Sequence, residues 1–214
     1  MSRDPLVCIV DDDEAIRESL RLLLYARGLG SHDYASADAF LSDESAREFD
    51  CMLLDIRMPG TDGLELFREL RRRQVAYPVI FITGHGDIPL AVSAIKQGAW
   101  DFLTKPFREG ELLEKVNGAI AHYRSARKQL LQRQKLRKRF DSCTPRERDV
   151  MKLLADGLPN KGIAEVLGIS PRTVEIHRAH VMEKMAAESL PALVRMVGTL
   201  DSSATTENER RVSD

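Results

Sequence analysis

Several side chains that could do phosphate chemistry directly follow apolar, strand-like runs in the first half of the chain. They are Asp11, Asp12, Asp13, Asp55, Thr83 and Lys105. Carboxylates brought close together repel one another unless a cation neutralises them, and their hard oxygens suit Mg²⁺ (or Mn²⁺). If the runs belong to one sheet, a divalent ion, Thr83 and Lys105 would cradle a phosphoryl group on Asp55.

Each of these residues also has a structural interpretation when it is taken alone. An aspartate at a strand end commonly caps the next helix, and Asp13 could do only that. Lys105-Pro106 could form a surface turn. Three carboxylates, a hydroxyl and an ammonium in this order favour a phosphoryl site over separate structural roles.

The runs that must position these side chains alternate with helical patterns. After Leu6–Val10, for example, Ile16, Leu20 and Leu24 recur at helical spacing. Apolar strands that alternate with helices indicate a parallel sheet covered on both faces. We therefore predict an α/β domain over residues 1–121, with a doubly wound five-stranded parallel sheet of the flavodoxin type. The other strands are expected near Ser31–Tyr34 and at Cys51–Leu54, Val79–Ile82 and Trp100–Leu103.

The segment 141–200 is predicted to be all-helical, with four helices. Thr144-Pro145 followed by Glu147 forms a capping box for the first. Gly168-Ile169-Ser170 forms a turn between two short helices, because Gly168 permits a left-handed backbone and Ser170 caps the next helix. The pattern predicts a helix-turn-helix, with a small bundle that binds no ligand as the alternative. The polar composition of 201–214 predicts a disordered tail.

Charge is distributed unevenly along the chain. Residues 1–121 carry 14 Lys/Arg against 21 Asp/Glu, and residues 122–140 carry 8 basic side chains without an acidic one. Residues 141–200 balance 8 against 8. This distribution indicates two modules joined by a basic linker. Two interpretations of the linker stay open, a continuous helix over Arg108–Phe140 and a helix followed by a flexible basic stretch.

Several protein classes are excluded by the sequence. No apolar run approaches the roughly 20 residues that span a bilayer, and no signal-peptide pattern is present at the N-terminus. Cys8, Cys51 and Cys143 are too widely spaced for a zinc site or a disulfide framework. We therefore expect a cytoplasmic protein that does not associate with membranes.

Four segments resemble the receiver domain of bacterial two-component response regulators, over roughly residues 5–122. They are Val10–Asp13, Leu54–Gly63, Thr83–Asp87 and Lys105–Phe107. The resemblance implies that Asp55 is the phosphoacceptor. It also implies that Asp12, Asp55 and the main-chain carbonyl of Arg57 hold Mg²⁺, while Asp11 acts through a metal-bound water.

The same resemblance implies roles for three further residues. Lys105 would pair with the carboxylate or the phosphoryl group, and Thr83 would bind a phosphoryl oxygen. Phe102 would change its rotamer with the state of Thr83, and ordinary packing is the alternative role for this ring.

The back half resembles the LuxR-type DNA-binding domain over about residues 141–200. The matching segments are Thr144–Arg148, Asn160–Ala164, Leu167–Ser170, Thr173–Arg178 and Lys184-Met185. The whole chain is therefore similar to the NarL/FixJ family of response regulators, and most similar to its FixJ-like branch. The resemblance implies a transcription regulator that a sensor histidine kinase phosphorylates, that dimerises on phosphorylation, and that binds double-stranded promoter DNA. RNA polymerase is a candidate partner, and metabolic catalysis is not expected.

This resemblance places the helix from about Pro171 to Met185 in the major groove. The side chains expected at base edges are Arg172, Glu175, Ile176 and Ala179, because Glu can accept from cytosine and Ile can pack on a thymine methyl group. The residues expected at phosphates are Lys161, Thr173, His177, Arg178 and Lys184. The balanced charge of this module predicts weak binding as a monomer.

Two other functions are alternatives for this sequence. A Mg²⁺-dependent aspartyl-phosphate phosphohydrolase would need a substrate pocket or cap insert, and the short strand–helix loops leave no length for one. A receiver that only relays phosphate to another protein would not need a helix-turn-helix.

Overall fold

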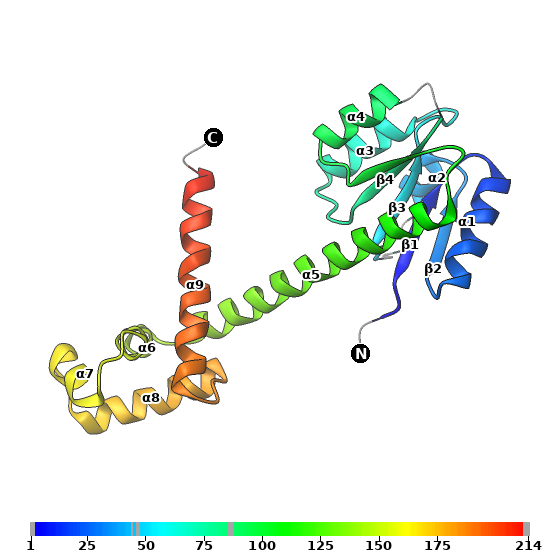
Figure 1. Ribbon diagram of the computed structural model, residues 1–214. Helices are drawn as coiled ribbons and strands as arrows, with labels where there is room; N and C mark the ends of the chain where they lie inside the picture. The colour runs from blue at the N-terminus through cyan, green and yellow to red at the C-terminus, as the bar shows by residue number, and fades with distance from the viewer. Residues whose placement is uncertain (1–2, 44, 46–47, 85–87, 212–214) are drawn as a thin grey trace. The chain divides into compact units, whose positions relative to one another are not determined.

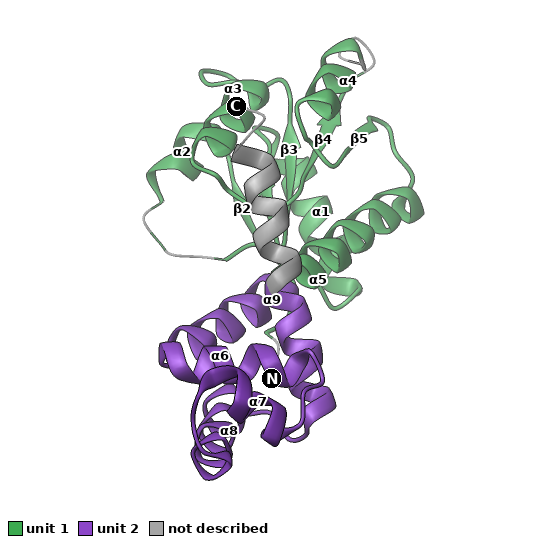
Figure 2. Cartoon of the chain, turned by 90° about the vertical axis from the view of Figure 1, so that its left-hand side faces the viewer, with its two compact units in different colours: residues 1–127 green, residues 128–214 purple. Residues whose placement is uncertain are grey.

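The chain forms two compact units, residues 1–127 and 128–214 (Figure 2). The computed structural model describes residues 3–43, 45, 48–84 and 88–211, without the side chains of 88 and 201–211. The division falls inside the segment 122–140 that the sequence predicts to be a linker. The boundaries predicted at 121 and 140 stay predictions.

Unit 1 alternates strands and helices along the chain, as the sequence predicts (Figure 1). Its elements are β1 (Leu6–Val10), α1 (Glu14–Ala26), β2 (Gly30–Tyr34), α2 (Ala37–Ser42), β3 (Cys51–Asp55), α3 (Gly63–Arg72), β4 (Val79–Thr83), α4 (Ile88–Lys96), β5 (Asp101–Thr104) and α5 (Glu109–Asp141). The short helix α2 is the one element of this unit that has no counterpart in the prediction.

The five strands form one parallel sheet with the order β2-β1-β3-β4-β5. In the register of the three central strands, Val10 lies beside Leu54 and Leu54 beside Phe81. The residues that follow these strands therefore begin at nearly the same level of one sheet edge. This topology confirms the predicted doubly wound fold.

Alternate strand residues point to opposite faces of the sheet, and each face has its own helices. One face packs on α2, α3 and α4, and its core includes Leu54, Phe67 and Phe81. The other face packs on α1 and α5, and its core includes Leu53 and Leu112. Because both faces are covered, every residue of β3 and β4 is buried.

Helix α5 is continuous from Glu109 to Asp141 and therefore crosses the division between the two units. This matches the first of the two linker interpretations. Near its midpoint, Arg124 binds both oxygens of Asp50 in a bidentate pair, at 2.9 and 3.1 Å. Arg127 pairs with Glu48, and Asp50 also accepts the amide of Leu6 at 3.0 Å. The loop before β3 thus ties α5 to the start of β1.

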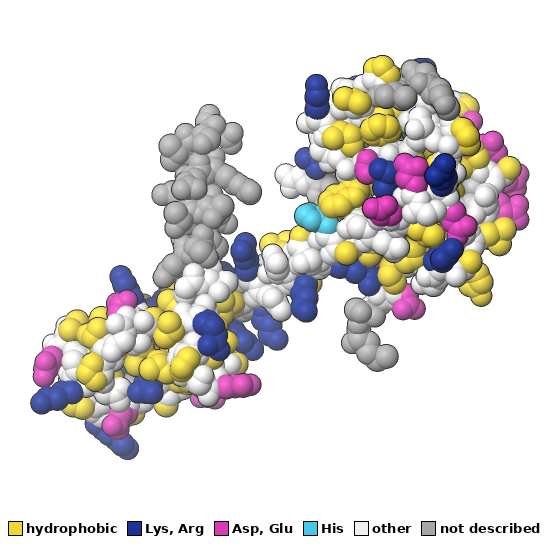
Figure 3. Space-filling view, in the orientation of Figure 1, with side chains coloured by type: hydrophobic (Ala, Val, Ile, Leu, Met, Phe, Trp, Pro, Cys, Tyr) yellow, Lys and Arg dark blue, Asp and Glu magenta, His cyan; other side chains and the backbone are white. Residues whose placement is uncertain are grey.

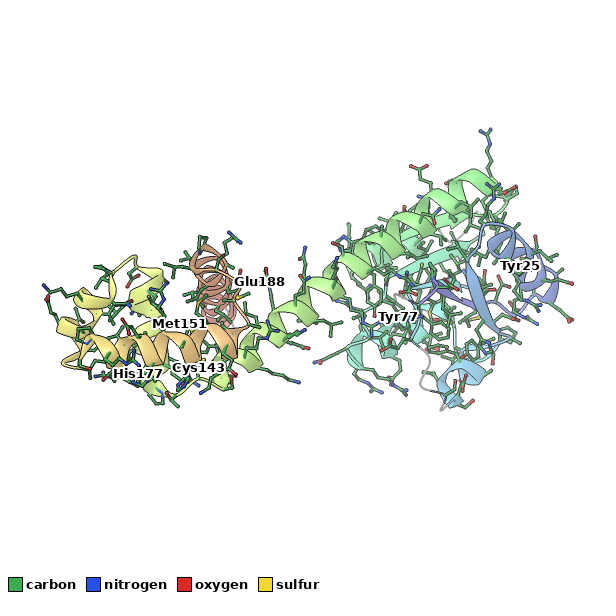
Figure 4. All side chains as sticks on the ribbon, turned by 90° about the horizontal axis from the view of Figure 1, so that it is seen from below. Tyr25, Tyr77, Cys143, Met151, His177 and Glu188 are labelled. Carbon is green, nitrogen blue, oxygen red and sulfur yellow. The ribbon has the colours of Figure 1, made fainter. Side chains whose placement is uncertain are left out.

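Unit 2 is all-helical, as predicted. After α5 come α6 (Pro145–Ala155), α7 (Asn160–Leu167), α8 (Pro171–Met185) and α9 (Leu190–Arg211). Met151 and Cys143 lie in its core (Figure 4). Leu136 and Phe140 of α5 pack against the same core, so the end of the linker helix is part of this unit.

The local signals read from this half of the sequence are present in the structure. Thr144 and Glu147 form the capping box of α6. Gly168 has φ +62° in the left-handed region, and Ser170 accepts the amide of Thr173 at 3.1 Å. α7 and α8 therefore meet in the predicted turn.

Two other expectations concern the tail and membranes. Helix α9 extends to Arg211, but side chains from 201 on and all of 212–214 lie outside the described residues, where the predicted disorder of 201–214 stays a prediction. In the described part of the chain, no helix is both long and apolar enough to cross a membrane.

The contacts of Asp50 predict that its charge stabilises unit 1. Burial raises the pKa of Asp50, but the hydrogen bonds and charges of its arginine partners outweigh burial and lower that pKa overall. The stabilisation is therefore present above the ordinary pKa of about 3.9 and lost as the pH falls through the lower value of the folded state. We expect Asp50→Asn to lower the free energy of unfolding by about 2 kcal/mol at neutral pH, and by less at acid pH, in urea titrations.

The matched control is Arg127→Gln, which breaks the more exposed pair with Glu48. A pair of this kind contributes about 0.5 kcal/mol. Equal losses for the two variants, or a loss at Asp50 that does not change with pH, would contradict the prediction.

Candidate functional site: an acidic strand-end cluster and an exposed helix face

The carboxyl ends of β1, β3, β4 and β5 bring the predicted acidic site together. Asp11 directly follows β1, and Asp55 ends β3 beside Ile82 of β4. Thr83 ends β4 beside Thr104 of β5. Parallel strands bring their carboxyl ends to the same edge, which is where open α/β sheets bind ligands.

Lys105 connects the acidic side chains. Its ammonium Nζ lies 2.9 Å from Asp11 Oδ2 and 2.8 Å from Asp55 Oδ1. Asp11 and Asp55 are 1% and 6% exposed. The second oxygen of Asp55 accepts the amide of Arg57 at 2.8 Å, and Asp11 Oδ1 accepts the amide of Asp13 at 2.9 Å. Both carboxylates are therefore fixed by two hydrogen bonds each.

Burial disfavours the charged forms of Asp55 and Lys105, whereas the ion pairs between Lys105 and the carboxylates favour them. Burial raises the pKa of Asp55 above its usual value, and the nearby charge of Asp11 adds to this, although Lys105 opposes both. Burial lowers the pKa of Lys105, but its two carboxylate partners outweigh burial and raise that pKa overall. Lys105 is therefore charged at neutral pH and offsets the repulsion between the aspartates.

The other acidic residues of the first loop have different surroundings. Asp13 caps α1 by accepting the amide of Ala15 at 2.9 Å, which is the structural role that the sequence left open. The Asp12 side chain is exposed, and its carboxylate makes no hydrogen bond or ion pair within the described residues. Asp12 thus offers oxygen atoms that no protein group occupies there.

Thr83 and Phe102, the two residues predicted to move on phosphorylation, lie at the carboxyl end of β4 and on β5. Thr83 is fully buried, and its hydroxyl donates to the carbonyl of Gly84 at 3.0 Å. Phe102 is half-buried and packs against the core on the face of α3 and α4. It lies beside Phe81 in the register of β4 and β5.

Oxygen donors near Asp55 suit a hard divalent cation. Asp11, Asp12 and Asp55 offer carboxylate oxygens, and Mg²⁺ is commonly bound through only one or two carboxylates with water completing its shell. In the described residues, no three His, Cys, Asp or Glu side chains surround a common point closely enough for an all-protein metal cage. The carboxylate oxygens of Asp12 and Asp55 are donors of the type that Mg²⁺ takes when water completes its shell.

Two residues that support this site, Gly63 and Arg17, have no role in the sequence-based prediction. A Cβ added to Gly63 would lie 2.0 Å from the carbonyl oxygen of Asp55, so only glycine allows α3 to begin so close to this strand end. Arg17 of α1 binds the main chain of the acidic loop. Gly63 could have been recognised from the sequence, because it directly follows Asp62, a typical helix N-cap residue, at the start of α3. The contacts of Arg17 depend on the folded loop and have no local sequence signal.

The second candidate site is one face of α8. Arg172, Glu175, Ile176 and Ala179 are all exposed and recur at three- and four-residue spacing. They form one stripe on the side opposite the buried Val174, Val181 and Met185. The structure thus brings together all the residues predicted to meet base edges.

The residues predicted to meet phosphates are less uniform. Lys161 is exposed, whereas Arg178 donates to Asn160 Oδ1 at 3.2 Å and Thr173 is paired with Ser170. His177 of α8 is half-buried, and its Nδ1 is buried with no partner among the described residues (Figure 4).

Lys184 of α8 is held by a residue of α6, and its predicted contact with phosphate stays a prediction. Its ammonium lies 2.6 Å from Oε2 of the buried Glu147, and His180 Nδ1 lies 3.5 Å from the other oxygen. Burial raises the pKa of Glu147, but the bonds from Lys184 and from the amide of Thr144 outweigh burial and lower it overall. Lys184 therefore fastens α8 to the start of α6.

Comparisons with known proteins match both units. Residues 7–117 match the response regulator receiver domain, and residues 141–197 match the bacterial regulatory proteins of the luxR family. The chain is 48% identical to the transcriptional regulatory protein FixJ of Azorhizobium caulinodans over 190 residues, which cover 89% of this chain and 90% of that protein. It is 44% identical to nodulation protein W of Bradyrhizobium diazoefficiens, over 99% of this chain and 93% of that one.

Solved structures of response regulators are also similar. The response regulator StyR matches with a TM-score of 0.83 and 40% identity, over 92% of this chain and 99% of that one. Full-length FixJ from B. japonicum matches with a TM-score of 0.60 and 43% identity, over 94% of this chain and 99% of that one.

The position of Lys105 between two buried carboxylates predicts the effect of its removal. We expect Lys105→Met to lower the free energy of unfolding of the Mg²⁺-free protein by about 2 kcal/mol at neutral pH, because Asp11 and Asp55 then repel each other without a cation. Without Lys105 the pKa of Asp55 loses the partner that opposes burial and rises further, so the loss should shrink as the pH falls and Asp55 becomes protonated. Urea titrations at neutral and acid pH measure both effects.

The control variant is Lys115→Met, which breaks a partly exposed pair with Asp101 outside the cluster. That pair should contribute less than about 1 kcal/mol. A Lys105→Met protein as stable as this control would show that the two carboxylates do not need the ammonium.

Proposed function

The chain belongs to the bacterial response regulators that join a receiver domain to a LuxR-type DNA-binding domain, and we propose that phosphorylation of Asp55 controls its binding to DNA. Regulators of this kind act on transcription within two-component systems, so a sensor histidine kinase and DNA are its partners. The observation that carries the proposal is Asp55 at the end of β3, with one oxygen bound to Lys105 and the other to the amide of Arg57. A cytoplasmic location follows from this role.

Asp55 would act as the nucleophile toward a phosphoryl donor. One carboxylate oxygen attacks phosphorus, and the donor group leaves with the electron pair of the bond that breaks. Asp12, Asp55 and the main-chain carbonyl of Arg57 would hold Mg²⁺, with Asp11 acting through a metal-bound water, and the ion would supply positive charge that offsets the charge of the phosphoryl oxygens. Lys105 would exchange a carboxylate oxygen for a phosphoryl oxygen and orient the group. This self-modification is stoichiometric.

Thr83 and Phe102 would carry the change away from the site. The Thr83 hydroxyl, now bonded to the carbonyl of Gly84, would turn toward a phosphoryl oxygen. The space that it leaves would admit the ring of Phe102, which is half-buried beside β4. Because α4 connects these two strands, its surface would change with them.

The α8 stripe of Arg172, Glu175, Ile176 and Ala179 would read bases in the major groove. Lys161, Thr173, His177 and Arg178 would contact phosphates, and Lys184 would act mainly through Glu147. The six basic residues of the linker after Arg127 carry positive charge that favours binding to the DNA backbone. Figure 3 shows Lys and Arg side chains along the exposed part of α5. RNA polymerase remains a candidate partner at the promoter.

The receiver would dimerise through α4 and β5 when it is phosphorylated. Ala91, Ala94 and the partly buried Ile95 of α4 pack on the core, whereas Leu90 and Val92 are 38% and 42% exposed. Trp100, next to β5, is 37% exposed. Hydrophobic side chains are visible at the surface around α4 (Figure 3). This is more apolar surface than α4 needs for packing in the monomer.

Asp55→Asn tests the phosphoacceptor. The substitution keeps the shape of the side chain but removes the nucleophile, so labelling by acetyl phosphate should disappear. Labelling is measured by intact mass spectrometry. The matched control is Asp38→Asn, an exposed aspartate of α2 that should be labelled at Asp55 like the parent protein. Retained labelling of Asp55→Asn would refute the assignment.

Dimerisation as the switch has its own test. Beryllofluoride should double the mass of the protein in solution and raise its affinity for selected DNA about 10²-fold, because the second half-site is then bound at high effective concentration. Val92→Asp should prevent both effects, whereas Leu22→Asp on α1, also at an exposed apolar position, should not. Light scattering and fluorescence anisotropy provide the measurements.

The alternative is that the receiver blocks the recognition helix and phosphorylation only releases it. A fragment of residues 128–214 keeps Leu136 and Phe140 with the core of unit 2. If release is the switch, this fragment binds DNA as tightly as the activated protein. Weak binding by the fragment supports dimerisation.

A further inference from the structure

We infer that Arg17 of α1 is a positioning residue that holds the backbone of Asp12, and so the base of its side chain, at the cation site beside Asp55. The inference rests on the proposed function, because it concerns how the acidic loop binds Mg²⁺. Arg17 lies outside the acidic motif and contacts neither Asp55 nor Lys105 in the described structure.

The guanidinium of Arg17 binds the main chain of the acidic loop. Its Nη1 donates to the carbonyl oxygens of Asp11 at 2.9 Å and of Asp12 at 3.0 Å. Its Nε donates to Asp33 Oδ2, at 3.2 Å, at the end of β2. The Arg17 side chain is only 13% exposed, so water competes little for these bonds.

The two bonds from Arg17 fix the backbone on both sides of the Asp12 Cα. The carbonyl of Asp11 belongs to the peptide plane before the Cα of Asp12, and the carbonyl of Asp12 belongs to the plane after it. When both planes are held, the backbone dihedrals of Asp12 are fixed, and so is the direction of its Cα–Cβ bond. The carboxylate itself has no partner within the described residues, so Arg17 fixes where its Cβ starts, while rotation about χ1 and χ2 stays free to bring its oxygens to a cation.

Binding to carbonyls rather than carboxylates also matters for the charge of the site. Arg17 places a positive charge beside a run of four acidic residues, Asp11 to Glu14, without occupying any of their carboxylate oxygens. A guanidinium paired with Asp12 would compete with a metal ion for the same oxygens. Arg17 therefore supports the loop and leaves Asp12 available to a cation.

Asp33 fixes Arg17 in turn. It is half-buried in β2 and also lies 3.9 Å from Arg21 Nε. Arg21 is one turn further along α1 and makes no hydrogen bond to the acidic loop in the described structure. Arg21 is thus a matched control, since it has the same charge, the same helix and the same partner.

The test measures Mg²⁺ affinity of the full chain by isothermal titration calorimetry. Removing a group that orients metal ligands typically weakens metal binding 10- to 100-fold. We expect the Kd for Mg²⁺ to rise about tenfold in Arg17→Gln and to stay within about twofold of the parent in Arg21→Gln. Arg17→Lys keeps the positive charge but loses the planar guanidinium that binds the two carbonyls and Asp33 at once, so its Kd for Mg²⁺ should be intermediate.

Hydrogen exchange in Mg²⁺-free protein gives a second readout. The amides of residues 12 to 14 should exchange at least fivefold faster in Arg17→Gln than in Arg21→Gln, while those of β3 are unchanged. A variant that merely destabilised the fold would accelerate exchange in β3 as well. If Arg17→Gln does not fold, Arg17→Lys against Arg21→Lys decides the question by the same two measurements.

The outcomes separate the inference from the function on which it rests. Equal Mg²⁺ affinity in the Arg17 and Arg21 variants, with normal labelling of Asp55 in the parent protein, overturns the role of Arg17 alone. A parent protein that binds no Mg²⁺ and is not labelled at Asp55 overturns the proposed function first.

Discussion

The ammonium of Lys105 is the interaction on which the receiver site depends. Two carboxylates buried at one sheet edge would be mutually destabilising, and the lysine makes them compatible by binding one oxygen of each. It can do so only because the strand order puts β5 two positions from β3, so that a long side chain from the end of β5 crosses the end of β4. The same geometry leaves the other oxygens of Asp11 and Asp55 to main-chain amides. The site is thus preorganised by local turns, and its net charge still attracts a cation.

A second constraint follows from the first, since rigid carboxylates require a rigid backbone beneath them. Gly63 lets α3 approach the carbonyl of Asp55 from one side. Arg17 holds the carbonyls of the Asp11–Asp12 loop from the other side. Neither residue supplies a group to the phosphoryl chemistry. Both act through the main chain, which is stiffer than any side chain and therefore suits a site that must distinguish small displacements of a phosphoryl group.

The sequence was sufficient for features that depend on local order. Strands, helix caps and the residues that follow each strand are written within a few positions of one another, and so Asp11, Asp55 and Lys105 could be identified before the fold was known. Contacts across the chain could not. The ion pair of Lys184 with Glu147, which lies 37 positions earlier on α6, could not be predicted from the sequence, and the predicted phosphate contact of Lys184 stays a prediction. The short α2 was missed because six residues give too little periodicity to recognise.

The linker helix shows how two separate cores can share one element. The first turns of α5 place Leu112 and Val116 in the receiver core, and its last turns place Leu136 and Phe140 in the core of unit 2. Between them the helix is largely exposed and carries like charges, which by themselves oppose a helix. Because helix formation is cooperative, anchoring at both ends maintains the exposed middle. The bidentate pair of Arg124 with Asp50 fixes where the exposed part begins. Packing at both ends therefore supports a helix that the linker's own residues, mostly strong helix formers without proline or glycine after Gly118, also favour.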